Sequence, residues 1–408
     1  MKQSTLTIIG GGASGMAAAI TAARMGSKVR LIEQKEKPGK KILSTGNGRC
    51  NFTNLSMGPD FFRGDDTSIT EIVMEEFGVR QTLKFFGSMG LLSRDRDGYV
   101  YPRSNQASAV QSVMLMELQK LNVELMTGTK ALQAKCRGHK FTVKTDHGQF
   151  ESDALILACG GKAAPVLGSD GSGYVLAKSF GHTLSPVVPA LTALKAEGFK
   201  KASGVRTDAM VTAVIDGKPE ASDTGELQIT NYGISGIPVF QISRYIAKAL
   251  HAKQQAEVEI DYFPQMEEED FKTFLYDRKV VHSGKTAEEF LVGIFPLKLI
   301  EMLLMKAGIK KYKKVSEISE TEWARLIQKC RRERVTVTDT NSFDQAQVCA
   351  GGVRTSEIWP NTMESRIIDG LYLTGELLDI DGCCGGYNLQ WAWSTGCLAG
   401  MYASKRRI

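Results

Sequence analysis

The first 33 residues alternate between short apolar runs and one longer stretch of small residues. Leu6–Ile9 is an apolar run, an alanine-rich stretch covers residues 13–23, and Lys28–Ile32 is a second mainly apolar run that ends at Glu33. Short apolar runs bounded by turn residues are typical of buried parallel strands, whereas the alanine-rich stretch favours a helix. The pattern therefore predicts a strand–helix–strand unit.

The turn between the first strand and the helix carries the glycine motif G-x-G-x-x-G at Gly10, Gly12 and Gly15. The first glycine permits a tight turn, the second lets the backbone approach a pyrophosphate, and the third lets the helix pack closely on the sheet. The N–H groups and dipole at the helix start attract phosphate, and Glu33 can accept hydrogen bonds from a ribose diol. We therefore expect an adenine dinucleotide site. The alternative is a plain strand–helix turn without a ligand.

The middle of the chain differs from both ends in residue composition and in its hydrophobic pattern, which predicts an inserted segment. Residues 190–262 carry short alternating runs rich in Thr, Val and Gly, as in a small β domain. Residues 264–333 are helical and charged, with a capping-box spacing from Ser319 to Glu322. Strand character returns at residues 335–338, so we expect a nucleotide-binding domain in two parts. The expected bounds are 1–188 with 336–408 for that domain, 189–262 for the β domain and 263–335 for the helical domain.

Composition narrows the class of protein. A chain of 408 residues is long enough for two or three domains, and 42% hydrophobic with 24% charged residues is typical of a soluble globular protein. The eight cysteines contain no C-x-x-C pair, which favours reduced thiols in a cytoplasmic protein and predicts no metal site. No run approaches the roughly 18 apolar residues of a membrane span, and nothing at the start resembles a signal peptide.

The formal net charge of +6 is too mild to indicate nucleic acid. Basic clusters at residues 310–314 and 331–334 are interpreted as solvated helix ends. The alternative, an RNA-binding patch, stays open.

The tail supplies the second strong pattern. Gly385 and Gly386 free the backbone to pass close to a planar ring, and Asn388 can cap the helix that follows. The start of such a helix, directed at the pyrimidine edge of a flavin, would stabilise the anionic reduced ring. The alternative is a helix packed on the sheet, which is the interpretation we favour for Trp391 and Trp393.

Several long segments together resemble one family, the BaiN/YhiN-type bacterial FAD-dependent oxidoreductases, also called the aminoacetone oxidase family. The resemblance covers nearly the whole chain. It implies a bipartite Rossmann-like FAD-binding domain of α/β class, with inserted β-barrel-like and helical domains. The segments that carry it are Gly10–Gly15, Gly46–Asn54, Gly225–Leu227, Tyr232–Gly236, Gly351–Val353, Thr362–Ser365, Gly370–Tyr372 and Gly385–Ala392.

The motifs and the resemblance together predict which residues contact FAD. The family position that often carries His before the Tyr-Gly pair is Asn231 here, so a proton-transfer role at that position is in doubt. The expected FAD contacts are Gly10, Gly12, Ala13, Ser14, Gly15, Glu33, Gln34, Lys35, Lys41, Ser44, Thr45, Gly46, Arg49, Asn51, Gly160, Gly375, Glu376, Asp379, Gly386, Asn388 and Leu389.

No residue stands out as the catalytic acid or base. Tyr101 and Tyr232 are candidates for lining a substrate pocket, and Arg103 and Arg354 could hold a carboxylate. Cys384 follows Cys383 directly, and the pair is either redox-active or, as we favour, two small residues in a tight turn.

We expect an oxidoreductase that transfers a hydride between flavin N5 and a small organic substrate, with NADH or NADPH as transient donor. No second G-x-G-x-x-G follows a strand, which predicts that the nicotinamide visits the flavin in turn. The alternatives are an amine oxidase that uses O2 and an FAD-containing protein that modifies or binds RNA.

Overall fold

The computed structural model describes residues 4–406 and confirms the predicted α/β Rossmann-like fold with an inserted barrel. The chain forms two compact units: unit 1 runs up to Val187 and resumes at Val348, and unit 2 is Val188–Gln347. No helix within residues 4–406 is long and apolar enough to cross a lipid bilayer.

A five-stranded parallel sheet forms the centre of unit 1, in the order β20-β11-β1-β2-β7. Ile8 of β1 lies between Ile156 of β11 and Leu31 of β2, and all three side chains are fully buried, as the continuous apolar runs predicted. The strands are β1 (Thr5–Ile9), β2 (Lys28–Ile32), β7 (Glu124–Met126), β11 (Ala154–Leu157) and β20 (Leu371–Leu373).

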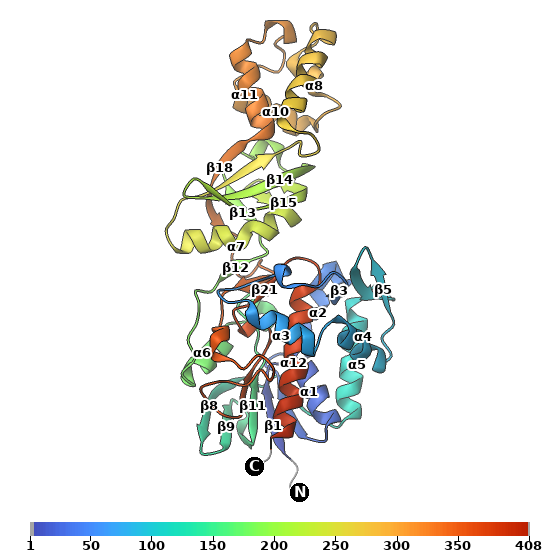
Figure 1. Ribbon diagram of the computed structural model, residues 1–408, viewed down its shortest axis with the longest axis vertical. Helices are drawn as coiled ribbons and strands as arrows, with labels where there is room; N and C mark the ends of the chain where they lie inside the picture. The colour runs from blue at the N-terminus through green and yellow to red at the C-terminus, as the bar shows by residue number, and fades with distance from the viewer. Residues whose placement is uncertain (1–3, 407–408) are drawn as a thin grey trace. The chain divides into compact units, whose positions relative to one another are not determined.

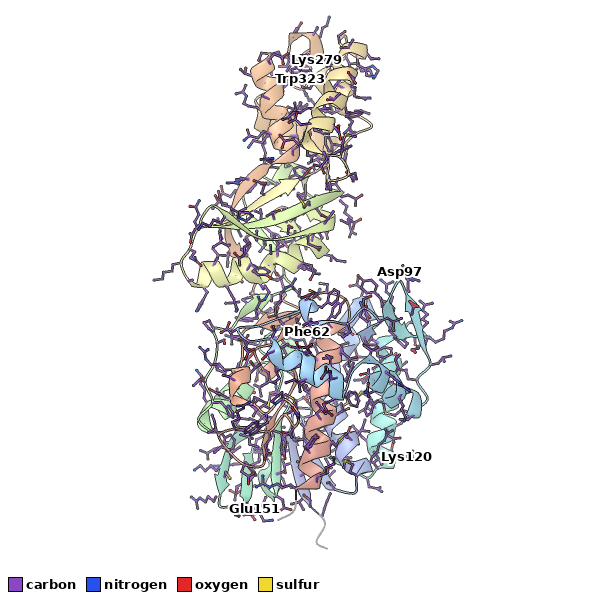
Figure 2. All side chains as sticks on the ribbon, in the orientation of Figure 1. Phe62, Asp97, Lys120, Glu151, Lys279 and Trp323 are labelled. Carbon is purple, nitrogen blue, oxygen red and sulfur yellow. The ribbon has the colours of Figure 1, made fainter. Side chains whose placement is uncertain are left out.

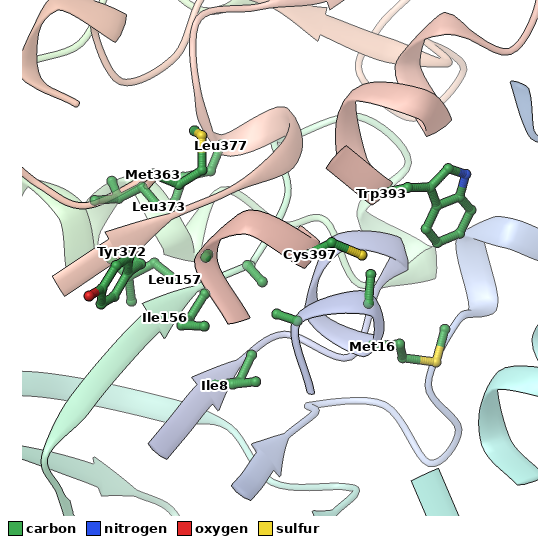
Figure 3. Close-up of a cluster of buried hydrophobic side chains, with 14 of the residues drawn as sticks. Ile8, Met16, Ile156, Leu157, Met363, Tyr372, Leu373, Leu377, Trp393 and Cys397 are labelled. Carbon is green, nitrogen blue, oxygen red and sulfur yellow. The ribbon is translucent and has the colours of Figure 1, made fainter. Parts of the chain in front are cut away.

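Two helices from the ends of unit 1 pack against each other beside this sheet, α1 (Ala13–Arg24) and α12 (Tyr387–Lys405) (Figure 1). A Cβ on Gly396 would lie 2.3 Å from the Ser14 carbonyl oxygen, and one on Gly400 would lie 2.4 Å from that of Ala18. Only glycine therefore allows this close crossing. Figure 3 shows Met16 of α1 and Trp393 and Cys397 of α12 among the buried side chains.

Smaller elements complete unit 1. An antiparallel sheet, β10-β9-β8, contains the hairpin formed by β9 and β10. A second antiparallel sheet has the order β3-β6-β5, and β4 pairs with β21. The strands are β3 (Thr53–Asn54), β4 (Phe62–Arg63), β5 (Ser93–Arg96), β6 (Tyr99–Pro102), β8 (Ala131–Arg137), β9 (Lys140–Thr145), β10 (Gly148–Ser152), β19 (Val348–Ala350) and β21 (Asp381–Gly382); the helices are α2 (Lys40–Ser44), α3 (Ser68–Glu76), α4 (Val79–Ser88), α5 (Ala107–Lys120) and α6 (Ser172–Ser179), with short 3-10 turns η1 (Thr45–Gly48), η2 (Pro59–Phe61), η3 (Pro165–Leu167), η6 (Thr355–Glu357) and η7 (Gly375–Leu377).

Unit 2 contains a closed barrel with the strand order β13-β16-β15-β14-β17-β18. Helix α7 packs on it, and α8 to α11 are inserted between β17 and β18. The capping box from Ser319 to Glu322 is confirmed at the start of α11. The strands are β12 (Val188–Ala190), β13 (Leu194–Ala196), β14 (Arg206–Ile215), β15 (Lys218–Ile229), β16 (Gly233–Ser235), β17 (Ala256–Asp261) and β18 (Glu333–Thr340); the helices are α7 (Ile237–His251), α8 (Glu268–Val281), α9 (Ala287–Leu291), α10 (Leu297–Ala307) and α11 (Glu320–Arg331), with η4 (Lys200–Ala202) and η5 (Val315–Glu317).

The second boundary of the insertion differs from the expected one. We expected the nucleotide-binding domain to resume at residue 336, but β18 pairs with β13 and β17 and closes the barrel. The chain returns to unit 1 only at Val348. Barrel and helices also share one apolar cluster, in which Val258 of β17 and Phe271 of α8 both take part. Strand periodicity predicts that a segment is a strand but does not identify its partners, which explains the difference.

The crossing of α1 and α12 generates a test of stability. We expect Gly400→Ala to lower the free energy of unfolding by about 1–3 kcal/mol, because the new methyl group would overlap the Ala18 carbonyl oxygen. The matched control is Gly87→Ala in α4, where a Cβ would meet no atom within 4 Å. Better helix propensity should then stabilise the control by up to about 1 kcal/mol. Thermal unfolding by circular dichroism measures both, and equal effects would contradict the steric explanation.

Candidate functional site

The glycine turn after β1 has the geometry that a bound pyrophosphate requires. Gly10 has φ of +105°, and a Cβ on Gly15 would lie 1.8 Å from the Gly10 carbonyl oxygen. At Gly12 a Cβ would meet no atom within 4 Å, so the space beside this backbone is open. Helix α1 begins at Ala13, and no side chain caps it. The N–H groups of its first turn, including that of Ser14, are therefore available to an anion.

Glu33 stands at the end of β2 with a buried carboxylate. One oxygen accepts the Gly11 N–H at 2.7 Å, and the other accepts the Lys35 N–H at 2.7 Å. Burial raises the pKa of this carboxyl, while the two N–H groups oppose the rise. The neighbouring Gln34 side chain donates to the Gly168 carbonyl at 2.5 Å. These contacts fix the acid beside the glycine turn, where the motif requires a ribose-binding group.

Two of the expected cofactor residues bind each other. Lys41 donates to Glu376 at 2.9 Å and to the Ala163 carbonyl at 3.2 Å. The second oxygen of Glu376 accepts the Cys349 N–H at 2.9 Å. Both oxygens of Glu376 therefore have protein partners. This ion pair joins α2 to η7, two segments that are far apart in the chain.

Asp379 has a buried carboxylate oxygen without a hydrogen-bond donor. Its side chain is 1% exposed, and one oxygen accepts the Asp65 N–H at 3.2 Å. The other oxygen is buried and has no hydrogen-bond partner among the described residues. A buried carboxylate oxygen without a donor is costly, so a ligand hydroxyl would relieve this position. Glu376 and Asp379 are both among the expected FAD contacts, and the unpartnered oxygen favours Asp379 as the acceptor for a cofactor hydroxyl.

The start of α12 lies beside Thr53 of β3 and the nearby Asn51. Gly386 has φ of +96°, and a Cβ there would lie 2.7 Å from the Thr53 carbonyl oxygen. The side-chain oxygen of Asn51 is buried without a partner. Gly386 precedes α12, and no side chain caps the helix. Its first N–H groups are therefore free of a side-chain cap, which suits an electron-rich ring edge.

The expected role of Asn388 as the helix cap is wrong. Asn388 is the second residue of α12, and its amide accepts the Gly382 N–H and donates to the Gly382 carbonyl, both at 2.8 Å. It therefore holds the turn before the helix instead of the helix itself. Leu389, which follows, packs against the unit 1 core.

The glycine-rich loop after α2 is exposed. Ser44 and Thr45 donate to carbonyls of α2, and Arg49 donates weakly to the Gly46 carbonyl at 3.4 Å. Gly160, at the end of β11, has φ of +70° and lies next to Ser169. The polar groups of unit 1 thus fit FAD. The glycine turn is open to the phosphates, and Glu33 stands where the motif requires a ribose-binding acid. Asp379 has a free acceptor for a hydroxyl of the polyol chain, and the start of α12 has no side-chain cap. Contacts of the individual residues with FAD stay predictions.

The structure separates the catalytic candidates. Tyr232 lies in unit 2 and accepts from Asn341 at 3.3 Å. The Arg354 guanidinium lies 3.9 Å from the Asp65 carboxylate. Sequence reasoning missed Asp65, although the Gly64-Asp65 pair could have indicated a turn there. Arg103 is exposed and directly follows the last residue of β6. Cys384 is partly buried. None of these positions identifies a catalytic group by itself.

The tryptophans of α12 have structural roles, as we favoured. Trp391 donates to the Gly375 carbonyl at 3.1 Å, and Trp393 donates to the Phe52 carbonyl at 2.9 Å. Both side chains are buried.

Known proteins match this chain over its whole length. The family model described as HI0933-like protein Rossmann domain matches residues 4–402. The 3-dehydro-bile acid delta(4,6)-reductase of Clostridium scindens is 52% identical over 403 residues, which cover 98% of each chain. The ribosomal RNA dihydrouridine synthase of Escherichia coli is 29% identical over 99% of this chain and 100% of its own length.

Among solved structures, the 3-ketosteroid delta1-dehydrogenase of Sterolibacterium denitrificans aligns with a TM-score of 0.53. Its sequence is 13% identical, and the alignment covers 99% of this chain and 100% of that one. This likeness is one of fold. The family match and the 52% identical relative confirm the expected resemblance and the expectation of a flavin-dependent oxidoreductase.

The unmet oxygen of Asp379 generates a test with two opposite readouts. We expect Asp379→Asn to raise the melting temperature of the FAD-free protein, because a buried carboxylate without a donor costs more than an amide. The same variant should lose FAD affinity about tenfold or more, because a charged acceptor is removed. Asp60→Asn, at an exposed position, is the control. Equal FAD dissociation constants for Asp379→Asn and the natural protein, by fluorescence titration, would remove Asp379 from the cofactor site.

Thiol chemistry generates a second test. Burial raises the pKa of Cys50, Cys349 and Cys397 to about 12. At pH 8 roughly one such thiol in ten thousand is ionised, so native alkylation should leave all three unmodified. The partly exposed Cys136 and Cys384 should react first. Peptide mass spectrometry before and after denaturation checks this, and fast native labelling of any of the three would contradict the burial.

Proposed function

Because the chain belongs to the HI0933-like Rossmann family, we propose that it is an FAD-dependent reductase of steroid enones. The substrate class is a 3-oxo steroid whose carbon–carbon double bond is conjugated with the carbonyl group. The observation that carries the proposal is the 52% identity to a 3-dehydro-bile acid delta(4,6)-reductase over 98% of both chains. FAD, when bound, supplies the hydride for such a reduction.

The residues of unit 1 have separable tasks in this proposal. The glycine turn and the start of α1 bind the pyrophosphate, and Glu33 orients the adenosine ribose. Asp379 accepts a hydroxyl of the polyol chain. The start of α12 stabilises negative charge on the reduced ring through its N–H groups and dipole. The proton donor for the substrate is not among the roles that these contacts support.

A reduced nicotinamide is the proposed electron source. The chain has no second glycine motif of the kind that begins at Gly10. Donor and steroid would therefore use the flavin in turn, with ping-pong kinetics. An amine oxidase that uses O2 remains the alternative among flavin reactions.

A second candidate is dihydrouridine formation in RNA, because the 29% identical relative carries that name. Uridine also has a double bond conjugated with a carbonyl, so the two reactions belong to one chemical class. The basic clusters favour the steroid, because several of their cations are already ion-paired. Examples are Lys311 with Glu301, Lys313 with Glu322 and Arg334 with Glu259.

The decisive experiment is an anaerobic study of the two half-reactions of the FAD-loaded protein. We expect NADH or NADPH to bleach the flavin, and a 3-oxo-4,6-diene steroid to restore its colour, with one of the two double bonds reduced for each reduced flavin that is reoxidised. Uridine-containing ribosomal RNA, primary amines with O2, and O2 alone serve as comparison reactions. Faster reoxidation by RNA than by the steroid, or double-reciprocal plots that intersect instead of running parallel, would contradict the proposal.

A further inference from the structure

The hairpin formed by β5 and β6 carries an unusual set of side chains on one face. In the antiparallel register, Arg94 lies opposite Tyr101, and Arg96 lies opposite Tyr99. Directly opposite residues share a face, and alternate residues along a strand do so as well. Arg103 follows Tyr101 at the next alternate position. We call these five residues the Tyr–Arg face.

The opposite face of the hairpin is buried on β6 and more open on β5. Val100 and Pro102 are buried, whereas Asp95, opposite Val100, is exposed. On the Tyr–Arg face, Tyr99 is 43% exposed and Arg96 and Arg103 are exposed. The tip of the hairpin is at Asp97, which Figure 2 labels at the edge of unit 1. The Tyr–Arg face is thus directed outward.

The Tyr–Arg face adjoins both glycine segments that we assign to the flavin. A Cβ on Gly385 would lie 2.9 Å from the Tyr99 ring, and a Cβ on Gly46 would lie 3.8 Å from the Tyr101 ring. Asn54, which pairs with Tyr99 across β3 and β6, donates to the Gly385 carbonyl at 3.0 Å. A ligand on this face therefore has direct access to the flavin end of the site.

The cations of this face are held without carboxylates. Among the described residues, Arg94, Arg96 and Arg103 have no acidic group within 4.0 Å. Arg94 donates one N–H to Asn105, and its buried Nε has no partner. Elsewhere arginines are commonly ion-paired, as Arg24 is with Glu117 and Arg206 with Glu226. Three guanidinium groups without an ion pair, beside the exposed Tyr99 ring and the half-buried Tyr101 ring, favour a ligand with several negative charges and a flat ring.

We propose that the Tyr–Arg face binds the phosphates and base of the reduced nicotinamide dinucleotide. This inference rests on the proposed function, which requires an electron donor. Residues two apart on a strand are separated by roughly 7 Å, so Arg94 and Arg96 present charges over a length comparable to a pyrophosphate. A steroid with one carboxylate needs a single guanidinium, whereas a dinucleotide carries two or three phosphate groups and planar rings that stack on tyrosine.

The test uses Arg96→Gln, Arg103→Gln and the double variant, all as FAD-loaded full-length protein. Stopped-flow bleaching of the flavin at increasing NADH and NADPH gives a half-saturating concentration and a limiting rate. We expect each substitution to raise the half-saturating concentration about tenfold, with the limiting rate changed less than twofold. Added salt should weaken donor binding to the natural protein more than to the double variant.

Two controls make this result specific. Arg137→Gln, at the exposed end of β8 in another sheet, should leave donor binding unchanged. The second half-reaction is measured separately, with protein reduced by dithionite and reoxidised by the steroid, and should be unchanged in all variants. Flavin absorbance and melting temperature verify folding; if Arg103→Gln loses FAD, Arg96→Gln near the hairpin tip gives the answer alone.

Three outcomes overturn the inference. Unchanged donor binding with weaker steroid binding assigns the face to the substrate carboxylate. Unchanged half-reactions with loss of RNA-oligonucleotide binding assign it to nucleic acid. A natural protein that neither nicotinamide reduces rejects the donor site, while the steroid half-reaction still tests the proposed function. Failure of the steroid alone rejects the proposed function and leaves the donor titration interpretable.

Discussion

The close crossing of α1 and α12 is the contact on which the cofactor site depends. Gly396 and Gly400 let two backbones approach to a distance at which any larger residue would overlap the carbonyls of Ser14 and Ala18. Each helix contributes its N-terminus to the candidate site, α1 at the phosphate turn and α12 at the ring end. Because the two helices are tightly packed, they have little freedom to shift relative to each other. Their contact therefore sets the distance between the positive N-terminal ends of α1 and α12.

Some polar groups around these helices have protein hydrogen-bond partners and others do not. This difference indicates which groups are available to a ligand. Lys41 and Glu376 neutralise each other and are further bonded to backbone groups. Asp379 and Asn51 each keep a buried oxygen without a donor. A protein retains such unmet acceptors at a free-energy cost, which is expected where a ligand is meant to meet them. The distinction corrects the simple view that every acid in the tail serves the cofactor.

Sequence reasoning predicted the features that local backbone sterics determine. It failed for features that depend on which distant segment pairs with a residue. The glycine turn at Gly10–Gly15 and the buried strands are specified locally, by turn geometry and apolar runs. The strand β18 was predicted, but the expected domain boundary beside it differs from the one in the structure, because alternation does not reveal which strands lie beside β18. Asn388 suits a cap, yet hydrogen bonds to Gly382 compete for the same amide, and nothing local decides between them. Only part of the Tyr–Arg face was predicted. The sequence singled out Tyr101 and Arg103 but not β5, the strand that pairs with β6.

The ion pair of Lys41 with Glu376 joins residues whose separation in the chain is 335 positions. All of unit 2 is synthesised between them, so a ribosome must complete the barrel and its helices before the cradle can exist. A nascent chain would expose the apolar edge of the first strands during that interval, with the glycine turn already made but unable to retain a nucleotide. The yellow prosthetic group can therefore be held only after the whole insertion has been synthesised.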